Sequence, residues 1–194
     1  MQGQRHYKLG FNISQNENIE RSLLTLNRTL SNENRYPKTI IELGTYLGGM
    51  SFLIKDIFPQ SEVHTFDIKE QCDISKLQKI TDVKCNICNI FDKDNTEKIV
   101  DLINQEGQTV IFCDNGDKPK EFNLFSGYLK PGDVILAHDY APNEQYYKSY
   151  MVDKIWNWLE IQDSDIFDAI KINNLSPFLY QEFLNSAWCC YRKE

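Results

Sequence analysis

The stretch "IIELGTYLGGMS", residues 40–51, joins an apolar run to a turn that contains glycines and then to a helix-like pattern. Such a stretch is either the ligand-binding turn of a nucleotide-binding sheet or only a strand that runs into a helix. The dinucleotide fingerprint GxGxxG requires a glycine two places after its first one, and Tyr46 occupies that place after Gly44. The stretch therefore does not match an NAD-binding motif, and the rest of the chain has to decide what the turn serves.

Apolar runs alternate with helical patterns from residue 39 to the end of the chain. The runs that predict strands are residues 39–43, 62–66, 83–90, 109–113, 133–137, 169–173 and 187–192. The patterns that predict helices are residues 48–58, 74–80, 94–105, 119–128 and 147–159. Because strands that alternate with helices of this length form βαβ units, the sequence predicts an α/β fold. We expect a doubly wound sheet of about seven strands, most of them parallel.

The N-terminal segment, residues 1–37, is predicted to be a helical lead-in to a domain that spans residues 38–194. Its first fifteen residues show no clear period and are expected to pack loosely. Ile19, Leu23, Leu26 and Leu30 follow a helical spacing, which predicts a helix over residues 16–30. Since the segment is not needed to complete the sheet, we expect a chain without residues 1–15 to fold. The segment either covers a site or pairs with another chain in a homo-oligomer.

The composition of the 194-residue chain is that of an ordinary globular domain, with 41% hydrophobic and 25% charged residues. A net charge of −7, without any run of Lys and Arg, argues against nucleic acid as a partner. No apolar run reaches the ~20 residues that span a membrane, and the N-terminus lacks the apolar core of a signal peptide. We therefore expect a cytoplasmic protein without a membrane partner. Among its six cysteines, the pairs Cys85/Cys88 and Cys189/Cys190 lie in apolar, strand-like runs, and we expect the cysteines to be buried thiols.

Four of the predicted strands end in polar groups, most of them acidic. The groups are Glu42, Asp67, Asp114 and the pair His138-Asp139. Ligands of open α/β sheets bind outside the carboxyl ends of the strands, so these side chains are expected to surround one site. Helix capping would explain one or two of these acids, but not all four.

The turn and the second strand indicate what kind of ligand the site takes. Asp67 follows Gly44 by close to the ~20 residues at which dinucleotide sites place the acid that binds the ribose hydroxyls. Glu42 would repel a pyrophosphate and suits a ligand that carries positive charge.

The stretch "IIELGTYLGGMS" with "EVHTFDI" (residues 62–68) resembles motifs I and II of the class I S-adenosylmethionine-dependent methyltransferases. The turn "ELGTYLG" is similar to that of the catechol O-methyltransferase group. The pair Gly48-Gly49 is more like the macrocin O-methyltransferase and cephalosporin-hydroxylase-like group. The resemblance covers the chain from about Thr39 onwards and implies a Rossmann-like sheet. In that sheet "NSAWCCYRK" (residues 185–193) would be the last, antiparallel strand, after a reversed strand near Ala169.

The resemblance implies S-adenosylmethionine as the cofactor and assigns residues to it. Glu42 would lie near the methionine end, Asp67 would bind the ribose, and Ile68 would pack on the adenine. Asn89 or nearby Asp92 would meet the adenine amino group. The remaining positions assigned to the cofactor site are Gly44, Thr45, Tyr46, Gly48 and Asp114.

A second set of residues, also implied by the resemblance, would serve the methyl acceptor. Related O-methyltransferases bind a divalent cation after strands four and five, which here means Asp114, His138 and Asp139. The ion would be Mg²⁺ or Mn²⁺, and a histidine ligand favours the softer one. His138 could instead be the general base, because its ordinary pKa lies near neutrality. Lys118 is a second candidate base.

These residues predict an enzyme that methylates a sugar or phenolic hydroxyl of a small molecule, with or without a metal ion. Two alternatives stay open at this point. One is a metal-independent N-methyltransferase, and the other is a protein that binds S-adenosylmethionine without catalysis.

Overall fold

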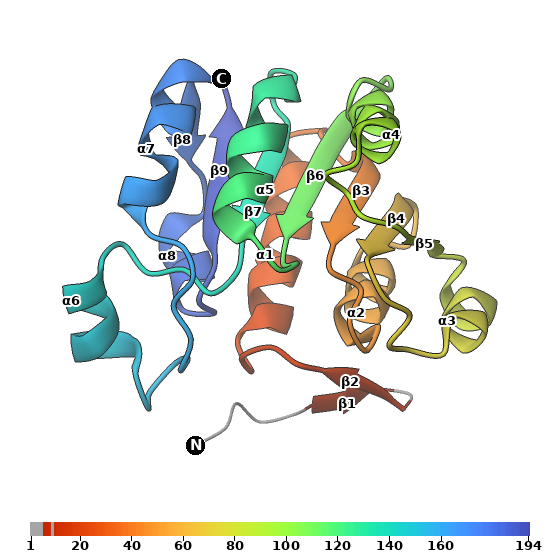
Figure 1. Ribbon diagram of the computed structural model, residues 1–194, viewed down its shortest axis with the longest axis horizontal. Helices are drawn as coiled ribbons and strands as arrows, with labels where there is room; N and C mark the ends of the chain where they lie inside the picture. Colours follow the sequence, from red (N-terminus) through yellow and green to blue (C-terminus); the bar gives the residue numbers. More distant parts are fainter. Residues whose placement is uncertain (1–5, 9) are drawn as a thin grey trace.

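A computed structural model describes residues 6–8 and 10–194, with side chains from residue 10 on. Seven strands form one sheet in the order β5-β4-β3-β6-β7-β9-β8 (Figure 1). The strands are β3 (Pro37–Leu43), β4 (Glu62–Asp67), β5 (Lys84–Ile87), β6 (Gln108–Cys113), β7 (Val134–Ala137), β8 (Leu175–Pro177) and β9 (Cys189–Lys193). The main helices are α1 (Ile19–Asn32), α2 (Gly49–Ile57), α3 (Ile74–Thr81), α4 (Lys93–Ile103), α5 (Lys118–Phe125), α7 (Asp163–Ile172) and α8 (Tyr180–Leu184).

The pairing of the strands confirms the doubly wound sheet with an antiparallel last strand. Strands β3 to β7 pair in parallel, whereas β9 runs antiparallel to both β7 and β8. The chain builds outwards from β3 to β5 and then returns to place β6 on the other side of β3. The crevice at the carboxyl ends of β3 and β6 is therefore the topological switch point at which such sheets bind ligands.

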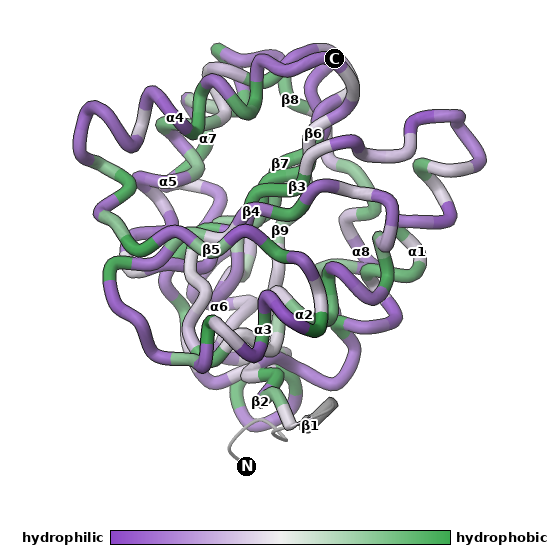
Figure 2. Tube along the Cα trace, turned by 90° about the vertical axis from the view of Figure 1, so that its right-hand side faces the viewer, coloured by the Kyte–Doolittle hydropathy of each residue, from purple (hydrophilic) through white to green (hydrophobic). Residues whose placement is uncertain are grey.

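Two apolar cores cover the two faces of the sheet. On one face α4, α5 and α7 pack on residues such as Ile41 and Ile111, and on the other α1, α2 and α8 pack on residues such as Ile40 and Phe112. Neighbouring residues of a strand point to opposite faces, so the continuous apolar runs of β3 and β6 reflect burial on both sides. Figure 2 shows the central strands β3 and β7 in the hydrophobic colour.

The strand predicted at residues 169–173 is wrong, because these residues belong to the end of α7 and the turn after it. A capping box between Gln162 and Asp165 starts the helix, and Ile166 and Ala169 bury its inner face. Periodicity alone cannot separate a short buried strand from a buried helical segment. The strand that precedes β9 is β8, three residues long and parallel to β7.

The described N-terminal residues are not loosely packed, contrary to the expectation from their composition. Strands β1 (His6–Lys8) and β2 (Phe11–Ile13) form a hairpin beneath the carboxyl edge of the sheet (Figure 1). Phe11 and Ile13 are each 4% exposed, and Phe11 stacks on Phe52 of α2 at 5.5 Å between ring centroids. A three-residue strand is too short to show a period, which is why its burial was missed.

The helix predicted at residues 147–159 is mostly absent. Helix α6 (Glu144–Tyr146) continues as a π-helical turn over Tyr147–Met151, and the chain then turns back towards the sheet. The carbonyl of Met151 accepts from the amides of Lys154, Ile155 and Trp156, which makes this reversal tight. Residues 156–160 consequently return to the carboxyl edge of the sheet.

The expectation that the cysteines are buried thiols is met by three of the six, and the other three are partly exposed. All six, which lie within the described residues, are free, and three of them (Cys113, Cys189 and Cys190) are buried in strands of the sheet. Within the same described part of the chain, none of the helices has the length and apolar character needed to cross a membrane.

Candidate functional site

A cavity of about 730 Å³ lies at the carboxyl edge of the sheet. Its walls come from six segments of the chain: residues 12–15, 44–50, 67–71, 114–118, 138–139 and 156–160. The ends of β3, β4, β6 and β7 thus contribute to one cavity, as the four polar strand ends predict.

The turn after β3 passes so close to β6 that only glycine fits at its start. Gly44 has a φ of +106°, and a Cβ atom there would lie 2.2 Å from the carbonyl oxygen of Asp114. Two residues later Tyr46 also has a positive φ, 45°, and its amide donates to Oδ2 of Asp67 at 2.8 Å. The Gly44 position therefore fixes the turn against β6, and Tyr46 ties it to β4.

Asp67 is buried at the end of β4 and lines the cavity. Its two oxygens accept from the amides of Tyr46 and Lys69, at 2.8 and 3.0 Å. A carboxylate oxygen has two lone pairs, so each can accept one further hydrogen bond. Ile68 beside it is 57% exposed and offers an apolar surface in the same wall.

Glu42 lies beneath the turn and does not line the cavity. It is fully buried, accepts a hydrogen bond from the hydroxyl of Ser51, and its Oε1 has no partner within the described residues. Burial raises the pKa of Glu42 to about 8. The negative charge expected of this side chain at neutral pH is therefore largely absent.

Two other residues assigned to the cofactor do not line the cavity either. The side-chain amide of Asn89 donates to Asp92 at 2.9 Å, and its oxygen accepts from the amide of Phe91 at 3.1 Å, in the loop before α4. Gly48 lies against the N-terminal hairpin and forms an isolated β-bridge with Asn12. A Cβ at Gly49 would lie 2.0 Å from the carbonyl oxygen of Asn12, so the glycine pair accommodates the hairpin.

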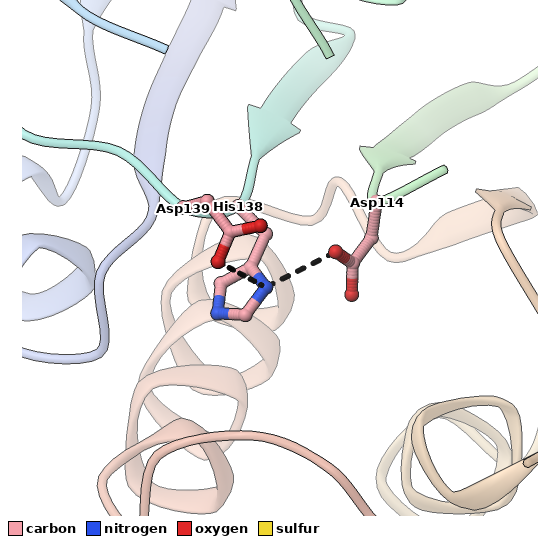
Figure 3. A group of neighbouring side chains, drawn as sticks. All are labelled: Asp114, His138 and Asp139. Carbon is pink, nitrogen blue, oxygen red and sulfur yellow. Dashed lines mark hydrogen bonds and ion pairs between the residues drawn. The ribbon is translucent and has the colours of Figure 1, made fainter. Parts of the chain in front are cut away.

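Asp114, His138 and Asp139 lie together at the ends of β6 and β7 (Figure 3). Nδ1 of His138 lies 3.0 Å from Oδ1 of Asp114 and 3.5 Å from Oδ1 of Asp139. Since carboxylates only accept, Nδ1 carries a proton. Burial opposes the charged imidazolium, but the charges of Asp114 and Asp139 outweigh it and raise the pKa of His138.

The ring of His138 lies between two tryptophans. Trp188 stacks on it at 4.8 Å and 25°, and Trp156 lies at 4.9 Å and 50°. Nε2 of His138 is buried and has no hydrogen-bond partner in the described part of the chain. Gln15 joins this group from the N-terminal segment: it accepts from Nε1 of Trp188 at 3.1 Å and donates to Oδ2 of Asp114 at 2.7 Å.

Lys118 is positioned as a cation and not as a base. Its ammonium lies 2.9 Å from Oδ2 of Asp139, 2.8 Å from Oε2 of Glu160 and 3.0 Å from the carbonyl oxygen of Asn115. Burial favours the neutral amine, but Asp114 and Asp139 outweigh it and raise the pKa of Lys118. The geometry thus disfavours the predicted role of Lys118 as a general base.

The three predicted metal ligands do come together, with potential ligand atoms within 4.8 Å of one another. Each oxygen of the two aspartates, however, already accepts from a side-chain donor of the protein. The ammonium of Lys118, 2.9 Å from Asp139 and 3.8 Å from Asp114, already supplies positive charge beside both aspartates, so the residues as placed do not fit a divalent cation.

Sequence reasoning missed three residues of this site: Gln15, Trp156 and Glu160. Gln15 lies in a segment without periodicity, Trp156 lies in the helix predicted over residues 147–159, and Glu160 directly follows it. No local signal distinguishes them, because their place in the site depends on contacts with residues far away in the chain.

No protein-family model matches this chain, and no curated protein does. Several solved structures do match this chain. A candidate caffeoyl-CoA O-methyltransferase from Staphylococcus aureus matches with a TM-score of 0.58 and 15% identity, over 90% of this chain and 83% of its own. Human N-acetylserotonin methyltransferase in complex with S-adenosylmethionine matches with a TM-score of 0.55 and 15% identity, over 90% and 51%. An O-methyltransferase family protein from Burkholderia thailandensis matches with a TM-score of 0.54 and 13% identity, over 91% and 58%.

At identities of 13–15% the likeness shows the fold alone, which this chain shares with these solved methyltransferase structures. The chain spans little more than half the length of the human and Burkholderia thailandensis proteins.

Proposed function

We propose that the protein transfers the methyl group of S-adenosylmethionine to a hydroxyl of a small molecule. The observation that best supports this function is one cavity that holds two kinds of group. The glycine turn and Asp67 lie at one end of it, and a buried cluster of His138, Asp139 and Lys118 lies at the other. The first set suits a nucleoside, and the second suits a polar acceptor.

The cofactor would lie over the turn after β3. Asp67 has lone pairs left for two ribose hydroxyls, and the exposed side chain of Ile68 can pack on a flat base. Gly44 lets the backbone of the turn approach the ligand closely, since glycine has no Cβ. Asn89 is not part of this arrangement.

The acceptor would lie between the turn and the segment of residues 156–160. Attack on a sulfonium methyl is a single displacement, so the protein has to align the two reactants and remove one proton. Glu160 is the group at this end placed to take a proton, whereas the charges of Asp114 and Asp139 raise the pKa of His138 and favour its protonated form. Nε2 of His138 is buried beside Trp156 and Trp188 and has no hydrogen-bond partner among the described residues, whereas the side chain of Glu160 is 44% exposed.

Methyl transfer in this cavity would need no metal ion, because the ammonium of Lys118 supplies positive charge beside Asp114 and Asp139. The partner would be a small-molecule acceptor. Nucleic acid is disfavoured as a partner by the net charge of −7.

Calorimetry with S-adenosylmethionine and S-adenosylhomocysteine tests this proposal. Both should bind, and Asp67→Ala should weaken binding by roughly 1–3 kcal/mol, because ribose hydroxyls would lose a charged acceptor. Asp168→Ala, on the exposed side of α7, serves as the matched control and should bind like the wild type. Binding of NAD with no heat from either methionine nucleoside would overturn the proposal.

Turnover is then measured as the release of S-adenosylhomocysteine in the presence of a panel of phenols, sugars and amines. A protein that binds the nucleoside and methylates only amines would contradict the hydroxyl acceptor but keep the cofactor.

A further inference from the structure

We propose that the ammonium of Lys118 takes the place of a divalent cation at Asp114 and Asp139. The wild-type protein then binds no metal ion at this site, and removal of the lysine charge creates a metal site. This inference concerns ion binding and does not rest on methyl transfer.

The position of the ammonium is the first observation. Lys118 is the first residue of α5, and its side chain is only 6% exposed. Its three N–H bonds are matched by three acceptors, namely Oδ2 of Asp139, Oε2 of Glu160 and the carbonyl oxygen of Asn115. Oδ1 of Asp114 lies 3.8 Å from the same nitrogen. The ammonium therefore lies against both aspartates at once.

The occupation of the carboxylate oxygens is the second observation. Oδ1 of Asp114 accepts from Nδ1 of His138 at 3.0 Å, and its Oδ2 accepts from Gln15 at 2.7 Å. Oδ1 of Asp139 accepts from Nε1 of Trp156, and its Oδ2 faces Lys118 at 2.9 Å. An ion that coordinates these carboxylates would have to compete with four donors from four different parts of the chain, namely Gln15, Lys118, His138 and Trp156.

Charge is the third observation. A cation within ligand distance of Asp139 would lie next to the buried ammonium, where water screens their repulsion poorly. The imidazole of His138 points its protonated Nδ1 towards the same oxygens, so it faces the ion with a hydrogen and not with a lone pair (Figure 3). The negative charges of the two aspartates are thus offset by the ammonium of Lys118 and by the N–H donor of His138.

A neutral side chain at position 118 would reverse this balance. Lys118→Met keeps the length of the stem but removes the charge, which leaves Asp114, Asp139 and Glu160 without their shared cation. Carboxylate oxygens are favourable ligands for Mn²⁺, and these three carboxylates surround the position of the ammonium at 2.8 to 3.8 Å. We therefore expect the substitution to convert the site from one that excludes ions to one that binds them.

Titration of the full chain with Mn²⁺, followed by the electron paramagnetic resonance signal of the free ion, tests the proposal. The wild type should bind no Mn²⁺ up to about millimolar concentration, whereas Lys118→Met should bind one ion at least about tenfold more tightly. The matched control is Lys55→Met, which removes a lysine that lies 2.9 Å from Asp82, away from the cavity. This variant should behave like the wild type. Adding Asp139→Asn to Lys118→Met should abolish the new binding.

Two results would overturn the proposal. One is stoichiometric, micromolar binding of Mn²⁺ by the wild type that Asp139→Asn abolishes. The other is a folded Lys118→Met variant that binds no more Mn²⁺ than the wild type. If Lys118→Met does not fold, the comparison of the wild type with Asp139→Asn still decides, because metal binding by the wild type at this aspartate contradicts the proposal and its absence supports it. Both results are independent of whether the protein binds S-adenosylmethionine.

Discussion

Burial decides what each acidic residue at a strand end can do. Asp67 and Glu42 end neighbouring strands, yet Asp67 lines the cavity and accepts two backbone hydrogen bonds, whereas Glu42 is sealed beneath the turn. A carboxylate without enough donors in an apolar environment takes up a proton instead of remaining charged. The two acids therefore have different roles, although the sequence presents them alike.

The protonation of Glu42 leads to a prediction about stability and pH. Its pKa is raised from 4.5 to about 8 in the folded protein, so the folded state holds a proton that the unfolded state has released between these two values. The free energy of unfolding should consequently fall as the pH rises from about 4.5 to 8, with an upper bound of roughly 5 kcal/mol.

Glu42→Gln, which cannot ionise, should show less of this fall. Urea denaturation of both proteins at several pH values checks the prediction. Buried Glu121, whose pKa is raised to about 7, contributes in the same direction in both proteins, so the difference between them isolates Glu42. Parallel curves for the two proteins would contradict the assigned pKa.

At the level of elements, the N-terminal hairpin is part of the site and not an appendage. Strand β2 places Phe11 against α2, and the residues that follow it bring Gln15 to Asp114 and Trp188. The side-chain amide of Asn16 donates to the carbonyl oxygen of Ile155 at 2.6 Å, which links the same segment to the wall formed by residues 156–160. Two segments that are far apart in the sequence thus support each other beside the cavity.

Deleting residues 1–15 should therefore destabilise the protein, in contrast to the expectation from the sequence. The loss of buried Phe11 and Ile13 alone should cost about 1.5–3 kcal/mol for each side chain. The loss of Gln15 also leaves Nε1 of Trp188 without its partner. Urea denaturation of the full and shortened chains measures the effect, and equal free energies of unfolding would show that the hairpin contributes nothing. The free energy of unfolding of Phe11→Leu should lie between those of the full and shortened chains, because leucine keeps most of the apolar volume.

For the molecule as a whole, the charge balance of the cavity predicts how the protein responds to chelators. If methyl transfer occurs in this cavity and Lys118 balances the aspartates, EDTA should leave turnover and cofactor binding unchanged. The metal-assisted mechanism implied by the sequence resemblance predicts the opposite, namely loss of turnover with cofactor binding intact. Turnover of the EDTA-treated protein, before and after addition of Mg²⁺ or Mn²⁺, distinguishes the two. Methyl transfer that depends on an added metal ion would contradict the proposal that Lys118 takes the place of such an ion.

Much of the fold, and the part of the cavity formed by Gly44 and Asp67, could be predicted from the order of the residues. Buried strands and amphipathic helices carry their own periodicity, and the carboxyl ends of parallel strands meet at one edge of the sheet. The turn at Gly44 and the acid at Asp67 are short-range features of this kind, so their meeting in one cavity follows from the alternation of strands and helices. The same local reasoning failed at residues 169–173, where a short apolar run fits a strand and a helix equally well.

In the part of the cavity near His138, packing decides which hydrogen-bond partners the side chains have and whether they carry a proton. Gln15 and Trp188 are 173 residues apart, and Lys118 and Glu160 are 42 apart, yet each pair forms a hydrogen bond. No local pattern encodes such contacts, because they arise from the way the hairpin and residues 152–160 fold back over the sheet. The alternation of strands and helices shows that acidic residues gather at this edge of the sheet. Whether these acids bind a metal ion, pair with a lysine or take up a proton depends on the donors that packing brings within about 3 Å.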